Sequence, residues 1–178
     1  MHVTTRTAIG ALSAATLAGS AIGGVSAFGH DDNSQGDQGN HGRHNGATVF
    51  RSAVAPSIPG PPVIHGVNAG GAPWVLRSGE IRIRRGGRFQ VRVRGLVIPN
   101  PPGDNTPGPV TTISASLYCG ADTETTAAAT TGQVPLSRKG NARIDQHVTL
   151  PSTCLAPIVL VHPNGLTGIY IATSGWRL

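Results

Sequence analysis

Aromatic residues, acidic residues and cysteine are scarce in this chain, and each scarcity limits the folds or functions that the chain can have. Only 4% of the residues are aromatic, 12% are charged, and Asp and Glu together number 8 in 178 residues. Catalysis by paired carboxylates, as in most glycosidases, therefore has few residues to draw on. The motifs GxSxG, HExxH, the P-loop and the dinucleotide fingerprint are all missing. We therefore expect a non-enzymatic protein that has no cofactor and no metal centre.

Good helix-forming segments are also lacking. The chain holds 25 Gly and 14 Pro, the two residues that most disfavour a helix. Thr, Ser, Val and Ile are plentiful, as in strands and turns. A length of 178 residues suits one domain of ordinary size with a tail. The composition predicts a single all-β domain with many turns.

The first 27 residues have the pattern of an export signal. Arg6 is followed by a stretch rich in Ala, Gly, Leu and Ile from Ala8 to about Gly24, and the small residues Val25-Ser26-Ala27 provide a cleavage point. The stretch is only weakly apolar and no basic cluster follows it, which argues against a membrane anchor. We predict a signal peptide over 1–27, no transmembrane segment in the mature chain, and a secreted protein that is extracellular or associated with the cell envelope.

Residues 28–47 contain almost no apolar side chain after Phe28. They cannot bury enough surface to repay the entropy of ordering, so this segment is predicted to be a disordered tail. Its three histidines are His30, His41 and His44. They lie near three aspartates, so an extracellular metal-binding function through this tail is one alternative, against the simpler interpretation of a hydrophilic spacer.

From residue 48 to 178, short alternating runs are separated by segments rich in Pro and Gly, a pattern typical of a β-sandwich or barrel. About seven strands in this stretch predict an immunoglobulin-like antiparallel β-sandwich domain over 48–178. The clearer strands are expected around 80–84, 89–94, 112–119, 143–150, 158–161 and 169–173, the weaker ones around 48–54 and 63–67, and long surface loops at 57–62 and 99–109.

The pairing of the two strands around Gly86-Gly87 has more than one solution. A two-residue loop would put apolar and polar residues together on each face, which a buried core forbids. A three-residue loop, Gly86-Gly87-Arg88, gives consistent faces but sets Arg82 opposite Arg92, an unfavourable like-charge pair. In the alternative, the two strands belong to different sheets of the sandwich.

Cys119 and Cys154 are the only cysteines. In an oxidising compartment, two cysteines in a small β domain most often form a disulfide. A metal or redox pair is disfavoured because the spacing is not C-x-x-C and no histidine ligand pattern accompanies it. We predict a structural disulfide.

Several stretches resemble secreted immunoglobulin-like β-sandwich proteins of high-GC Gram-positive (actinobacterial) type. They are GRFQVRVRGLVIP, ISASLYCG, GNARIDQHVTLPSTCLAPIVLVHPNG and YIATSGW, within residues 73–178. The resemblance implies an exported sandwich. It brings no established activity and no catalytic residues.

Positive charge is the strongest functional signal. From residue 48 onward there are 12 Lys and Arg against 5 Asp and Glu, and 11 of the 12 cations are arginine. If the two central strands share a sheet, Arg82, Arg84, Arg92 and Arg94 form an exposed grid that can hold phosphate, sulfate or carboxylate groups. Dedicated nucleic-acid binding is not expected, because Phe89 is the only aromatic residue nearby and it points inward.

The predicted partner is therefore an anionic cell-envelope polymer, such as a teichoic acid or an acidic polysaccharide. The chain is expected to be a binding or structural module, and the charge alone is also compatible with a passive surface. A small secreted hydrolase is a further alternative, because Asp145 and His147 lie two apart on one strand face beside Arg143. A solvated ionic row explains these three residues equally simply.

Overall fold

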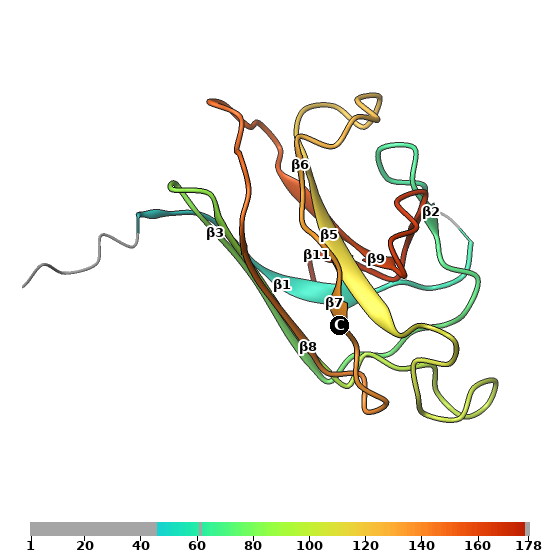
Figure 1. The fold of residues 1–178 in the computed structure, drawn as a ribbon. Helices are drawn as coiled ribbons and strands as arrows, with labels where there is room; N and C mark the ends of the chain where they lie inside the picture. The colour runs from blue at the N-terminus through green and yellow to red at the C-terminus, as the bar shows by residue number, and fades with distance from the viewer. Residues whose placement is uncertain (1–45, 61, 177–178) are drawn as a thin grey trace, which may run out of the picture. The chain divides into compact units, whose positions relative to one another are not determined.

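Strands joined by turns and loops build the domain, and no helix occurs in the part of the chain that the structure describes. The computed structural model describes residues 46–60 and 62–176 (Figure 1). The predicted signal peptide over 1–27 and nearly all of the predicted tail over 28–47 lie outside these residues. Among the described residues, no helix is long and apolar enough to cross a membrane.

Eleven strands lie within the described residues, and seven of them have three or more residues. These seven are β1 (Thr48–Pro56), β3 (Ser78–Arg84), β4 (Arg88–Arg94), β5 (Thr112–Tyr118), β8 (Ala142–His147), β9 (Ile158–Pro163) and β11 (Ala172–Ser174). The two-residue strands are β2 (Asn68–Ala69), β6 (Ala129–Thr130), β7 (Val134–Pro135) and β10 (Ile169–Tyr170).

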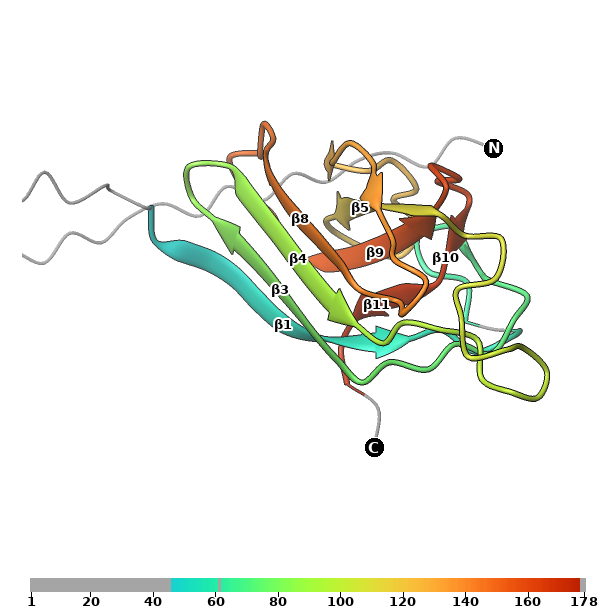
Figure 2. The same cartoon turned by 60° about the horizontal axis from the view of Figure 1, so that its bottom comes forward.

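One curled antiparallel sheet forms both layers of the fold. Its strands follow the order β6-β5-β9-β11-β1-β3-β4-β8, with β7 also paired to β5, while β10 and β2 form a separate parallel pair. β1 belongs to both layers, since its first part pairs with β3 and its last three residues pair with β11. Figure 2 shows β1, β3, β4 and β8 side by side, with β9 running across them. The prediction of an all-β, sandwich-like fold is confirmed.

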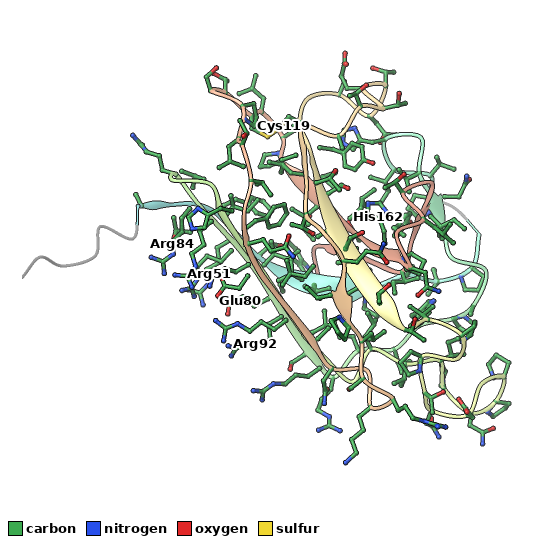
Figure 3. All side chains as sticks on the ribbon, viewed as in Figure 1. Arg51, Glu80, Arg84, Arg92, Cys119 and His162 are labelled. Carbon is green, nitrogen blue, oxygen red and sulfur yellow. A yellow bond between two sulfur atoms is a disulfide. The ribbon has the colours of Figure 1, made fainter. Side chains whose placement is uncertain are left out.

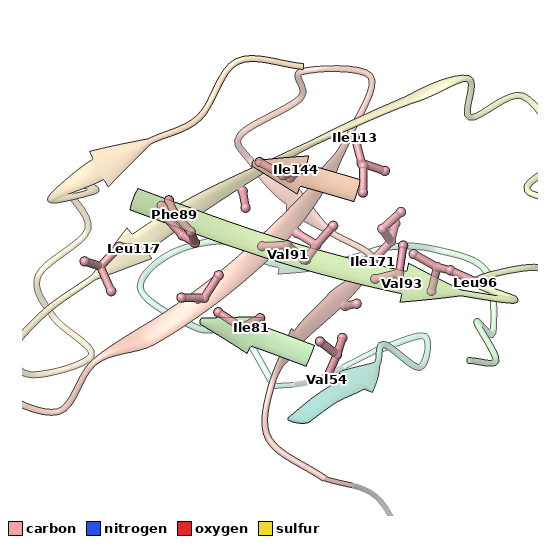
Figure 4. Packing of buried hydrophobic residues seen from close by; sticks show 14 of the residues in the cluster. Val54, Ile81, Phe89, Val91, Val93, Leu96, Ile113, Leu117, Ile144 and Ile171 are labelled. Carbon is pink, nitrogen blue, oxygen red and sulfur yellow. The ribbon is translucent and has the colours of Figure 1, made fainter. Parts of the chain in front are cut away.

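The main core lies between the two layers (Figure 4). Alternation along β3 and β4 turns every second side chain inward, where burial of apolar area supplies most of the folding free energy. Ile81, Phe89 and Ile144 come from the layer formed by β1, β3, β4 and β8, and they are 0% exposed. Ile113 and Val161 come from the layer that contains β5 and β9, and they are also 0% exposed.

A second apolar cluster covers the other face of the β5–β9 layer. It is formed by Val67, Tyr118, Leu160 and Tyr170. The β5–β9 layer is therefore buried on both faces, as its nearly continuous apolar sequence requires. The β3–β4 layer has one apolar and one polar face, so its outer face is the one that meets solvent.

Three predicted strands differ from those observed. Residues 63–67 contain only an isolated bridge between Ile64 and Val67. The strand predicted to run to residue 150 ends at His147, where the backbone N–H of Val148 donates to Gly87 at the neighbouring turn. The run 169–173 divides into β10 and β11, which pair with different strands. Conversely, the weak candidate around 48–54 belongs to the longest of the strands, β1.

The β3–β4 hairpin corrects both predicted pairings. The strands lie in one sheet, and the loop has three residues, Arg85-Gly86-Gly87, rather than Gly86-Gly87-Arg88. Gly87 adopts φ +85° and its N–H donates to the Arg84 carbonyl at 2.8 Å, as in a type I turn that is closed by a left-handed residue. The shifted register places Glu80, not Arg82, opposite Arg92, so the predicted like-charge pair does not form.

The predicted disulfide between Cys119 and Cys154 is confirmed, with the two Cα atoms 5.1 Å apart. Cys119 directly follows β5, and Cys154 lies in the segment before β9. The bond therefore ties together the segments next to one end of a strand pair that is already joined by backbone hydrogen bonds. Such a bond is compatible with an extracellular location.

Candidate anion-binding face

The outer side of the β1–β3–β4–β8 layer carries a concentrated set of charges, which we call the arginine face. Its side chains point outward because the alternate positions on each strand are apolar and buried in the core. Figure 3 shows Arg51, Glu80, Arg84 and Arg92 on this side of the sheet. The charged members of the face are Arg51, Arg82, Arg84, Arg88, Arg92, Arg94, Arg143, Glu80 and Asp145, and His147 lies beside them on β8.

Glu80 organises the first cluster of the face. Its Oε1 accepts from Arg51 Nε at 2.8 Å and from Arg82 Nη2 at 2.9 Å. Arg82 lies two residues further along the same strand, and Arg51 lies on the neighbouring β1. The hydrogen bond from Arg82, and then the charges of Arg51 and Arg82, lower the pKa of the Glu80 carboxyl.

Asp145 organises the second cluster in the same manner. Arg88 binds it through two parallel bonds, Nε to Oδ1 at 2.7 Å and Nη2 to Oδ2 at 2.8 Å, the fork geometry that suits a carboxylate. Arg143, two residues away on the same strand, donates to Oδ2 at 2.9 Å, and Gln90 donates to Oδ2 at 3.1 Å. The bonds from Arg88, Arg143 and Gln90 hold the pKa of this carboxyl far below its usual range.

Arg92 lies between the two clusters, on the central strand β4. In the sheet register it is directly opposite Glu80 on one side and Arg143 on the other. Its side chain is exposed, and it forms no ion pair with any carboxylate of the described residues. A cation is thus left facing solvent at the centre of the face.

A hollow of about 290 Å³ opens at this point. Its lining comes from three neighbouring strands and contains four guanidinium groups and one carboxylate, so that it is strongly positive. The polar lining residues are Glu80, Arg82, Arg84, Gln90, Arg92 and Arg143.

The hollow brings together three of the four predicted grid residues. Arg82, Arg84 and Arg92 line it, whereas Arg94 lies beyond it, opposite Ser78. The sequence prediction missed Arg143 as a member of the site, because that membership depends on β8 pairing with β4. Its position on the same strand face as Asp145 was a usable signal, but nothing local indicated which strand lies beside it.

The geometry does not assemble the Asp145 and His147 pair of the hydrolase alternative. Both oxygens of Asp145 are engaged by arginine and glutamine side chains. His147 lies in register with Arg88, and no hydrogen bond between His147 and Asp145 is present. No group of three or more metal-ligating side chains occurs within residues 46–60 and 62–176, and the histidine tail of the metal-binding alternative lies outside them.

A larger hollow of about 720 Å³ opens between the two layers beside the β3–β4 turn. Phe50, Leu117 and Val148 are among its apolar lining residues, and Arg85 is the one charged residue that lines it within 46–60 and 62–176. Among the described residues that line it, none is a carboxylate or a histidine.

No protein-family model, no curated protein and no solved structure matches the chain.

Proposed function

We propose that this protein is a secreted, non-enzymatic binding module that docks an anionic polymer of the cell envelope on the arginine face. One observation carries the proposal: seven arginines and two carboxylates share one exposed sheet face, and a positive hollow opens among them. The whole face would attract a long negatively charged polymer. Guanidinium groups are suited to bind the anionic groups of such a polymer.

The location of the charge supports a binding role. Seven arginines lie on the one face of the β3–β4 layer that the core leaves exposed, whereas four other described cations, Arg77, Arg85, Arg138 and Lys139, lie elsewhere. Seven arginines share this face with two carboxylates, so the face carries a surplus of positive charge. Proteins that need charge only for solubility gain nothing from such concentration on one face.

The test compares binding of the full chain to a glycerol-phosphate polymer at low and at moderate salt. The first variant changes Arg82, Arg84, Arg92 and Arg94 together to serine. We expect binding that weakens with salt in the wild type and is reduced at least tenfold in this variant, since polymer binding of this kind rests on screened charge.

A matched variant removes four cations away from the hollow: Arg77, Arg85, Arg138 and Lys139 are changed to serine. The net charge of the two variants is the same, so the second variant should keep most of the affinity if the face is the site. An equal loss of affinity in both variants would show that binding depends on net charge and not on the arginine face. Binding that does not respond to either variant or to salt would refute the proposal.

A further inference from the structure

The two carboxylates of the arginine face are unexpected in a site for anions, because they would repel the ligand. Removing Glu80 and Asp145 would leave a surface of greater positive charge. Yet each carboxylate binds two arginines, one two residues away on its own strand and one on the neighbouring strand. The same arrangement occurs at both sides of the hollow. Attraction between the arginines and an anionic ligand does not explain why the two carboxylates are there.

The hydrogen bonds suggest what the carboxylates do. Glu80 holds Arg82, and Asp145 holds Arg143 and Gln90, and all three held side chains line the hollow. An unbound arginine on a surface samples many rotamers, and ordering it on binding costs affinity. Side chains that are already fixed lose less freedom when a ligand arrives.

We propose that the hollow is a preorganised site for a tetrahedral phosphodiester group, with Glu80 and Asp145 as positioning residues. The inference rests on the proposed function, and it names the ligand chemistry. Guanidinium groups from three neighbouring strands line the hollow, so a ligand there lies within reach of N–H donors from more than one strand. A phosphate group presents several acceptor oxygens to such donors, whereas a planar carboxylate is matched by a single fork.

The space and the charge agree with this ligand. A volume of about 290 Å³ is several times the roughly 30 Å³ that one water molecule occupies in the liquid. It therefore admits a phosphate group with part of the polyol to which it is esterified. Arg92 projects between the two clusters and provides a cation that no described carboxylate engages.

The decisive variants are Glu80→Gln and Asp145→Asn, measured in the full chain with the glycerol-phosphate polymer. Each variant makes the protein more positive by one charge. A purely electrostatic face would then bind more tightly, whereas a positioned site should bind about three- to tenfold more weakly, because the arginines are no longer held in place. Glu80→Asp and Asp145→Glu keep the carboxylate and should restore part of the loss.

Polyglutamate of matched length provides the carboxylate comparison. We expect the wild type to prefer the phosphate polymer and the two neutralised variants to lose that preference. Tighter binding by these variants, or no preference between the polymers in the wild type, would overturn the inference while leaving the proposed function intact. Absence of any polymer binding by the wild type would instead remove the proposed function itself.

A second measurement does not depend on the stability of the variants. Inorganic phosphate is titrated into the wild-type chain while the Nε–H signals of arginine are followed by NMR. The signals of Arg82, Arg92 and Arg143 should shift together, whereas those of Arg77 and Arg138 should not. Uniform small shifts at all arginines would contradict a defined site.

Discussion

At Glu80 and Asp145, single carboxylates determine where several cations point. Each is partly exposed, with 43% and 25% of the side chain accessible, so its ion pairs contribute little to stability. Their effect is on side-chain order: Asp145 alone receives bonds from Arg88, Arg143 and Gln90. A surface charge can therefore matter more for what its neighbours bind than for the free energy of unfolding.

His162 presents the opposite situation, a titratable side chain that is completely buried, with 0% exposure. Its Nδ1 lies 2.7 Å from the carbonyl oxygen of Ile169, which only accepts, so Nδ1 donates the proton. Nε2 has no hydrogen-bond partner among the described residues. Burial lowers the pKa of the imidazole, because the charged form would lose its solvation.

This burial predicts a loss of stability in mild acid. The unfolded chain takes up a proton at the ordinary pKa of about 6.5, while the folded His162 resists it until lower pH. The stability that neutral His162 contributes is fully present above pH 6.5. It is lost as the pH falls toward the pKa of His162 in the folded protein, by at most about 1.4 kcal/mol per pH unit. Urea unfolding of the wild type at pH 7.5 and at pH 5 measures it.

The comparison variant is His162→Asn, which can still donate near the Nδ1 position but cannot titrate. Its urea midpoint should depend less on pH than that of the wild type, whatever its absolute stability. His147→Asn, at an exposed position of β8, is the control for the removal of a histidine as such. Equal slopes for the wild type and the His162 variant would show that other groups cause the acid sensitivity.

Among the elements, the β3–β4 hairpin sets the composition of the arginine face. Its loop fixes which residues lie opposite one another, and a shift of the loop by one residue changes every neighbour on the face. Gly87 is the residue that enables this loop, with φ +85°. A Cβ added there would also collide with the carbonyl oxygen of Val148.

Gly87→Ala is therefore expected to destabilise the domain by about 1–2 kcal/mol or more, through the left-handed conformation together with the collision. Gly86→Ala is the matched control, because a Cβ at Gly86 meets no atom within 4 Å and φ there is not in the left-handed region. Urea midpoints of both variants provide the measurement. Similar losses at the two glycines would be incompatible with the observed turn.

Alternation predicted β3, β4 and β5 because the two-residue period is a local property that each strand carries in its own sequence. The register was not predictable in this way, since two adjacent glycines allow more than one loop. Arg82, Arg84 and Arg92 were found as site residues because they lie on strands that the alternation revealed.

The remaining site residues depend on contacts between distant segments. Arg51 and Arg143 join the arginine face only because β1 pairs with β3 and β8 pairs with β4. No local pattern specifies which strands become neighbours, so these members could not be assigned from the sequence. The division of residues 169–173 between two strand pairs has the same origin.

At the scale of the whole domain, the disulfide is the one covalent cross-link among the described residues. It joins residues 35 apart, a loop for which removal of the bond typically costs about 2–4 kcal/mol. Changing Cys119 and Cys154 together to serine should lower the urea midpoint accordingly. Reductant should lower the wild type to the level of this variant and leave the variant unchanged, and a wild type that is insensitive to reductant would contradict the expectation.

β1 has a consequence for the order in which the domain can be made. This strand stands at the start of the described chain, yet its last residues pair with β11, at positions 172–174. The join between β1 and β11 therefore needs residues from both ends of the described chain. Contacts between such distant residues slow the search for the native state. Until β11 pairs with it, this edge of β1 has unpaired backbone groups that can pair with other chains, so the step that completes the sheet also removes a site of aggregation.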